Sequence, residues 1–100
     1  MILVVDDEAE SRTLLTAILT AEGYDVRTAD EGELALASIA GGRPELILLD
    51  IRMPGMDGFE TCRRLKHSAD TQEIPLMFLS AAGDLADRVE GLRLGAVDFV

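Results

Sequence analysis

The chain has 100 residues, which is enough for one small domain with a single hydrophobic core. Its residues are 48% hydrophobic and 28% charged, a composition that excludes a disordered tail. Nineteen acidic residues against nine basic ones leave a formal charge of -10, which argues against nucleic-acid backbones and anionic membranes as primary ligands.

Cysteine content and hydropathy indicate the cellular compartment in which such a chain would be found. Cys62 is the one cysteine, so no internal disulfide can form and a secreted disulfide scaffold is excluded. No apolar run approaches the roughly 20 residues of a membrane span, and residues 1–20 lack the basic start and cleavage site of a signal peptide. We therefore expect a cytoplasmic protein that does not bind membranes.

Five segments are predicted to be strands. Three of them are short, continuous apolar runs, which are typical of parallel strands buried on both faces. A fourth alternates apolar and polar residues, and the last ends in Phe99-Val100. In chain order, the predicted strands cover residues 2–5, 24–29, 46–49, 76–79 and 96–100.

Four helical patterns fall between these strands. Gly23 is expected to end the first helix, and Asp57 is a candidate N-cap for the third. The apolar residues that share a face are Leu14, Leu15, Ile18 and Leu19 in the first pattern, Leu34, Leu36 and Ile39 in the second, Phe59, Cys62 and Leu65 in the third, and Leu85, Val89 and Leu92 in the fourth.

Alternating strands and helices require right-handed crossovers and a parallel sheet that is covered on both faces. The order βαβαβαβαβ therefore predicts an α/β fold, a flavodoxin-like, doubly wound, five-stranded parallel sheet. Ligands of such a sheet bind outside the carboxyl ends of the strands, near the switch in strand order.

Polar side chains follow three of the predicted strands. Asp6 and Asp7 come after the first strand, Asp50 after the third and Ser80 after the fourth. The first loop has no glycine, whereas dinucleotide-binding and P-loop proteins need glycines there to bring backbone N–H groups to phosphate. Binding of a nucleotide in that manner is therefore not expected.

The three aspartates would repel one another if the fold brings them together. Two carboxylates about 5 Å apart repel by roughly 3 kcal/mol at an effective dielectric constant near 20, so either one stays protonated or a cation lies between them. A donor set of oxygens alone favours Mg²⁺ or Mn²⁺ over zinc. The alternative is structural, with Glu8 or Glu10 and their neighbours capping a helix. Packing does not explain a charge at Asp50, directly after an apolar strand, so we favour a phosphoryl-binding site.

Four segments together resemble the response-regulator receiver (CheY-like) domain of two-component systems, and the resemblance covers essentially all 100 residues. The segments are Ile2–Glu8, Leu48–Gly58, Leu79–Ala81 and Gly95–Phe99. In such a domain Asp50 would accept a phosphoryl group from the phosphohistidine of a sensor histidine kinase or a histidine phosphotransfer protein.

The resemblance also assigns a Mg²⁺ cofactor. Asp7, Asp50 and the backbone carbonyl of Arg52 would bind the ion directly, with Asp6 acting through water. The implied role is a phosphoacceptor switch that assists only its own phosphorylation and dephosphorylation, and not an enzyme. An output domain or target, a homodimer partner and a phosphorelay are compatible with this role, but the sequence does not choose among them.

The resemblance also implies roles for four further residues, because they stand at positions that act in the switch or in dephosphorylation in this family. Ser80 would move toward the phosphoryl oxygens, and Phe99 would fill the space that this movement leaves. Arg52 and Ala82, each two residues after a site residue, would set the rate of dephosphorylation. Because Ala82 offers no acid or amide to orient water, we expect a long phosphoryl lifetime.

Two family features fall outside these residues. The lysine that contacts the acceptor would lie two residues beyond Val100, and the fifth helix of the (βα)5 fold is absent. We therefore expect residues 1–100 to form a single receiver domain that is truncated at its C-terminus and by a few residues at its N-terminus.

Two other functions remain as alternatives. A Mg²⁺-dependent phosphohydrolase could use Asp50 as its nucleophile, but such enzymes need a general acid two residues later, where this chain has Arg52, and a cap for which there is no insertion. A receiver fold could also serve purely as a protein-interaction module that is never phosphorylated.

Overall fold

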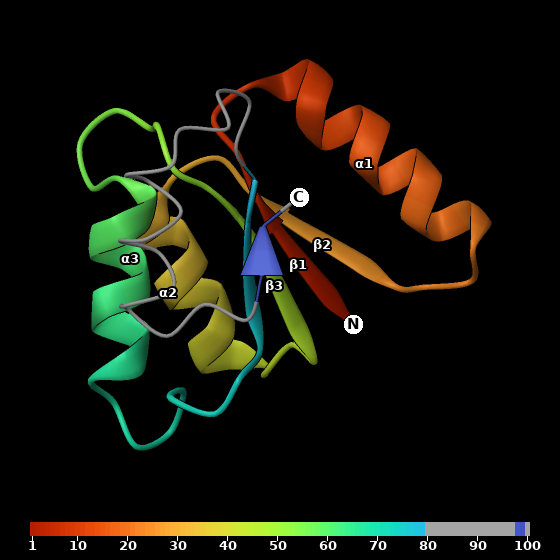
Figure 1. The fold of residues 1–100 in the computed structure, drawn as a ribbon. Coiled ribbons are helices and arrows are strands. Elements are labelled where there is room, and N and C mark those ends of the chain that lie inside the picture. Colours follow the sequence, from red (N-terminus) through yellow and green to blue (C-terminus); the bar gives the residue numbers. More distant parts are fainter. Residues whose placement is uncertain (80–97, 100) are drawn as a thin grey trace.

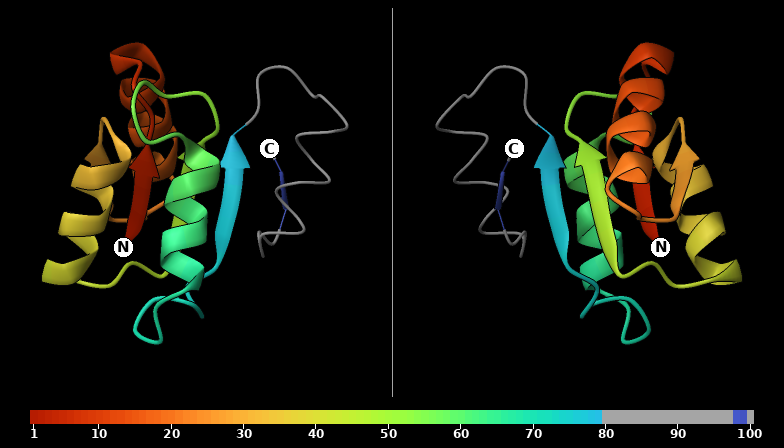
Figure 2. Two further views of the ribbon diagram at one scale, coloured as in Figure 1. Left: turned by 90° about the vertical axis from the view of Figure 1, so that its left-hand side faces the viewer. Right: turned by 90° about the vertical axis from the view of Figure 1, so that its right-hand side faces the viewer.

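A computed structural model describes residues 1–79 and 98–99 of the chain and contains a five-stranded parallel sheet with helices on both faces (Figures 1 and 2). The strand order is β2-β1-β3-β4-β5, which confirms the predicted doubly wound sheet. Within the described ranges, no helix is both long and apolar enough to span a bilayer. The elements are β1 (Ile2–Val5), α1 (Ala9–Ala21), β2 (Val26–Ala29), α2 (Gly32–Gly41), β3 (Leu46–Asp50), α3 (Gly58–Lys66), β4 (Leu76–Leu79) and β5 (Asp98–Phe99).

The predicted elements agree with these bounds with small differences at the ends. Strand β2 begins two residues later than predicted, and β5 covers the two residues of the predicted segment 96–100 that the structure describes. Helix α1 ends at Ala21, and Gly23 adopts a φ of 94°, a conformation that favours glycine. The fourth predicted helix lies outside the described residues.

The two faces of the sheet carry separate apolar clusters because successive strand residues point to opposite sides. On one face, Leu3 and Val5 pack with residues of α2 and α3, including the buried Cys62. Helix α1 covers the other face of the sheet (Figure 2), where Ile2 and Val4 pack with residues of that helix. Burial raises the pKa of the Cys62 thiol, which agrees with its predicted place in the core.

The predicted apolar face of the first helix is only half right. Leu15 and Leu19 pack against the sheet, but the side chains of Leu14 and Ile18 are 61% and 51% exposed. Leu34 of α2 is likewise exposed, although Ile39 of that helix is buried. The four α1 residues form a wide stripe, and the helix meets the sheet along one line, so only one column of the stripe packs against the sheet and is partly buried.

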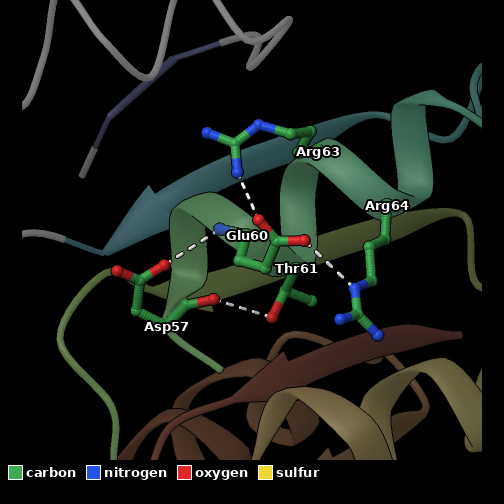
Figure 3. Close-up of polar contacts among 5 residues, drawn as sticks. All are labelled: Asp57, Glu60, Thr61, Arg63 and Arg64. Carbon is green, nitrogen blue, oxygen red and sulfur yellow. Dashed lines mark hydrogen bonds and ion pairs between the residues drawn. The ribbon is translucent and has the colours of Figure 1, made fainter. Parts of the chain in front are cut away.

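Helix α3 begins with the predicted cap (Figure 3). The Asp57 carboxylate accepts a hydrogen bond from the backbone N–H of Glu60 at 2.9 Å, and the buried Thr61 hydroxyl donates to the Asp57 carbonyl at 2.9 Å. On the exposed side, the Glu60 carboxylate pairs with Arg63 and Arg64, whose hydrogen bonds lower the pKa of Glu60. Because these ion pairs are exposed, the cap and the buried face contribute more to the position of α3.

The first residue of α3 packs directly against the end of β3. The Gly58 N–H donates to the Ile51 carbonyl at 2.9 Å, and a β-carbon on Gly58 would overlap the Asp50 carbonyl oxygen and lie 2.8 Å from the Ile51 Cα. The contact is with backbone, which has little freedom to move away. A residue without a side chain is therefore required where α3 meets the strand that carries Asp50.

We expect Gly58→Ala to lower the free energy of unfolding by about 1–3 kcal/mol, because the added methyl group overpacks a backbone contact. Chemical denaturation measures this loss. Gly41→Ala, at the end of α2, is the matched control, because a β-carbon there meets nothing within 4 Å. Equal losses in the two variants would contradict the close packing described here.

Candidate functional site

The carboxyl ends of β1 and β3 meet at the point where the strand order reverses. The chain passes from β1 to β2 on one side and then to β3 on the other, so β1 lies between them. Val5 is paired with Leu49, so the next residues, Asp6 and Asp50, lie at the same level of neighbouring strands. This is the position at which open α/β sheets bind their ligands.

Three carboxylates converge at this switch point. One carboxylate oxygen from each of Asp6, Asp7 and Asp50 lies within 4.8 Å of the other two. Asp6 is buried, Asp50 is half-buried and Asp7 is exposed, so the cluster opens to solvent on one side. The structure thus brings together the three aspartates that the sequence analysis selected.

The backbone and side chain of Asp6 are both held. Its N–H donates to the Ala29 carbonyl of β2 at 3.1 Å, and its carbonyl accepts from Nη1 of Arg12 at 2.8 Å. The Asp6 Oδ1 atom accepts from the Glu8 N–H at 3.0 Å. These contacts fix the turn between β1 and α1 on which Asp6 and Asp7 lie.

Two details of this turn differ from the sequence analysis or were missed by it. Glu8 occupies the N-cap position of α1, but its side chain makes no capping hydrogen bond, so the structural alternative is wrong for this residue. Arg12 was not selected at all. A lone arginine in the first turns of a helix gives no pattern, and only the folded turn places the Asp6 carbonyl within its reach.

The Asp50 carboxyl has a perturbed acidity. Partial burial and the negative charge of Asp6 raise its pKa to about 6, with a further contribution from Asp7. A hydrogen bond from the Arg52 N–H opposes the shift by favouring the carboxylate form. Burial and the neighbouring acids together thus favour the protonated form of Asp50.

The remaining predicted site residues are only partly described. Arg52 has an exposed side chain, and its backbone N–H contacts Asp50. Phe99 lies in β5, which pairs with β4, but its side chain is not among the described features. Ser80 and Ala82 lie outside the described residues.

The donor set suits a hard divalent cation. The cluster consists of carboxylate oxygens without histidine or cysteine, a combination that favours Mg²⁺ over zinc. Two ligands of one Mg²⁺ at about 2.0–2.1 Å lie at most about 4.2 Å apart, and oxygens within 4.8 Å of one another are compatible with direct binding or with one bridging water. Mg²⁺ commonly keeps several waters in such sites. The residues therefore fit the expected ion.

The raised pKa of Asp50 has a consequence for stability. The folded-state pKa of about 6 lies above the ordinary value of 3.8, so the metal-free fold loses stability as the pH rises from about 4 to 6. We expect Asp50→Asn to be more stable than the unsubstituted protein at pH 8 by about 1–2 kcal/mol, after allowing for solvent screening. The two proteins should become equal near pH 4.

Denaturation in a chelator between pH 4 and pH 8 measures this difference. Asp25→Asn, at an exposed carboxylate before β2, serves as the control and should leave the pH dependence unchanged. A constant difference between Asp50→Asn and the unsubstituted protein across this range would contradict the repulsion.

The chain is similar to known proteins over almost its whole length. A family model for the response regulator receiver domain matches residues 2–100. The response regulator PleD of Caulobacter vibrioides is 50% identical over 99 residues, which are 99% of this chain and 22% of PleD. A probable transcriptional regulator, ycf27 of Cyanophora paradoxa, is 46% identical over 99% of this chain and 40% of its own length. This chain thus spans less than half of either relative.

Solved structures show the same fold. The chemotaxis protein CheY4 of Vibrio cholerae has a TM-score of 0.94 at 30% identity, over 99% of this chain and 82% of that one. The receiver domain of NtrX from Brucella abortus has a TM-score of 0.92 at 38% identity, over 100% of this chain and 83% of that one. With the family match, these similarities show that the chain belongs to the response regulator receiver domains, which are in general phosphoacceptor switches and not enzymes.

Proposed function

We propose that Asp50 is the phosphoacceptor of this receiver domain and that Asp6, Asp7 and Asp50 hold Mg²⁺ beside it. The observation that carries the proposal is the convergence of these three carboxylates at the switch point of the sheet. We assign direct coordination to Asp7, Asp50 and the carbonyl of Arg52, and contact through water to Asp6. Mg²⁺, when bound, neutralises negative charge on the phosphoryl oxygens.

The chemistry proposed for the chain itself is nucleophilic attack. A carboxylate oxygen of Asp50 attacks the phosphorus of a phosphohistidine, the P–O bond forms as the P–N bond breaks, and the imidazole leaves with the electron pair. A pKa of about 6 leaves this carboxyl ionised at neutral pH, as the attack requires. The Arg52 N–H helps to orient the attacking group through its hydrogen bond to Asp50.

The response to phosphorylation is assigned to two residues near the end of the chain. Ser80, directly after β4, would donate to a phosphoryl oxygen, and Phe99 of β5 would move into the space that Ser80 leaves. Because β4 and β5 are neighbours, such a change would alter the surface at this side of the sheet.

The proposed phosphoryl donor is a sensor histidine kinase or a histidine phosphotransfer protein in the cytoplasm. Helix α1 starts immediately after the acidic turn and exposes Leu14 and Ile18, one helical turn apart. Apolar side chains beside a reactive site suit contact with a partner protein. We also propose that the domain acts on an output domain or target and can form a homodimer. No residue is assigned to these interactions.

Phosphorylation at Asp50 is tested by mass spectrometry of the intact protein after incubation with acetyl phosphate and Mg²⁺. We expect one phosphoryl group on the unsubstituted protein and none on Asp50→Asn, because an amide cannot act as the nucleophile. Asp25→Asn, which replaces an exposed carboxylate outside the cluster, should be phosphorylated normally.

Other outcomes separate the alternatives. Absence of a phosphoryl group on the unsubstituted protein would favour an interaction module that is never phosphorylated. Sustained release of inorganic phosphate from a generic phosphate ester would favour a phosphohydrolase. Phosphorylation that persists in Asp50→Asn would assign the acceptor to another residue.

The lifetime of the phosphoryl group is the second proposal on this site. We expect the double substitution Arg52→Asn and Ala82→Glu to speed dephosphorylation by about tenfold, because an amide and an acid would orient the attacking water. The decay of the phosphorylated mass after removal of acetyl phosphate measures this rate. An unchanged rate would show that these two positions do not control water attack here.

A further inference from the structure

We propose that Arg12 is a positioning residue that holds the acidic turn between β1 and α1 in the geometry that binds Mg²⁺. The inference rests on the proposed Mg²⁺ site and adds a residue to which no role has been given. Arg12 is half-buried, and its Nη1 donates to the backbone carbonyl of Asp6 at 2.8 Å.

The contact lies at the centre of a short chain of hydrogen bonds. The Asp6 N–H is bonded to Ala29 of β2, so one side of this residue is anchored in the sheet. On its other side the chain leaves the sheet, and there the Asp6 carbonyl is bonded to Arg12. The Arg12 N–H in turn donates to the Glu8 carbonyl at 3.1 Å, and the Glu8 N–H donates to the Asp6 carboxylate at 3.0 Å. Arg12 thereby closes the turn through its side chain and its backbone together.

Such a turn needs an anchor because its acids repel their neighbours. One carboxylate oxygen from each of Asp6, Asp7 and Asp50 lies within 4.8 Å of the other two, so moving Asp6 and Asp7 away would relieve their repulsion in the metal-free protein. A turn free to open would have to be closed again whenever Mg²⁺ binds, and affinity would fall accordingly. The hydrogen bond from Arg12 fixes the Asp6 carbonyl and so opposes that opening.

The chain offers a matched control for the loss of an arginine. Arg27 of β2 also donates from Nη1 to a backbone carbonyl, that of Ser38 at 3.1 Å, and to the Ser38 hydroxyl at 3.1 Å. It ties β2 to α2 and does not contact the acidic turn. Arg12→Met and Arg27→Met therefore each remove one positive charge and a side-chain hydrogen bond to a backbone carbonyl. The bond is lost beside the acidic turn in Arg12→Met and away from it in Arg27→Met.

The experiment combines Mg²⁺ titration by calorimetry with amide hydrogen exchange of the metal-free protein. We expect the Mg²⁺ dissociation constant to rise about tenfold in Arg12→Met, as for residues that orient metal ligands, and to stay within about twofold in Arg27→Met. Arg12→Lys, which keeps the positive charge and a donor on a shorter side chain, should lie between these values. The Glu8 N–H should exchange faster in Arg12→Met, while the Gly58 N–H, bonded to Ile51, should not change.

Each other outcome has a definite meaning. Unchanged Mg²⁺ affinity in both Arg12 variants, or an equal loss in Arg27→Met, would overturn the inference. Weaker binding with unchanged Glu8 exchange would also overturn it, because the turn would then have kept its position and the loss of affinity would have another cause. If Arg12→Met does not fold, Arg12→Lys decides by the same two measurements. Failure of the unsubstituted protein to bind Mg²⁺ would reject the proposed function, and Glu8 exchange would still test whether Arg12 holds the turn.

Discussion

The mutual repulsion of three carboxylates is the constraint around which the site is organised. Asp6, Asp7 and Asp50 lie together because β1 and β3 are paired in register and end at the same level of the sheet. The core strands therefore force a contact that the side chains by themselves would avoid. Burial and this contact together raise the pKa of Asp50. A bound cation would offset the repulsion, and the oxygen donors of the cluster suit one.

The surroundings of the cluster are built to keep it in place. The two strands that carry the acids are buried on both faces, so their ends have little freedom. Gly58 lets the capped start of α3 pack against the backbone of Asp50, and Arg12 closes the turn after Asp6. A site on rigid strand ends suits phosphoryl transfer, in which positioning and charge neutralisation dominate.

The relatives place this chain in a modular class of proteins. It spans 22% of PleD and 40% of ycf27, whereas it covers about four fifths of the CheY4 and NtrX receiver chains. The shared portion is thus the receiver fold itself. The described part of this fold also exposes two large apolar side chains on α1, Leu14 and Ile18.

The sequence by itself determined the element order, the parallel sheet and the three aspartates, because apolar runs followed at once by acids are local patterns. Only the tertiary structure decided which side of α1 packs against the sheet, leaving Leu14 and Ile18 exposed, since that depends on how the helix meets the sheet. Likewise, Arg12 contacts Asp6 and Gly58 lies close to Asp50. No local sequence pattern shows that these residues come together in the folded chain. The periodicity of apolar residues predicts whether one segment is a helix or a strand and which of its faces is apolar. Hydrogen bonds and packing between segments depend instead on how the segments are placed in space.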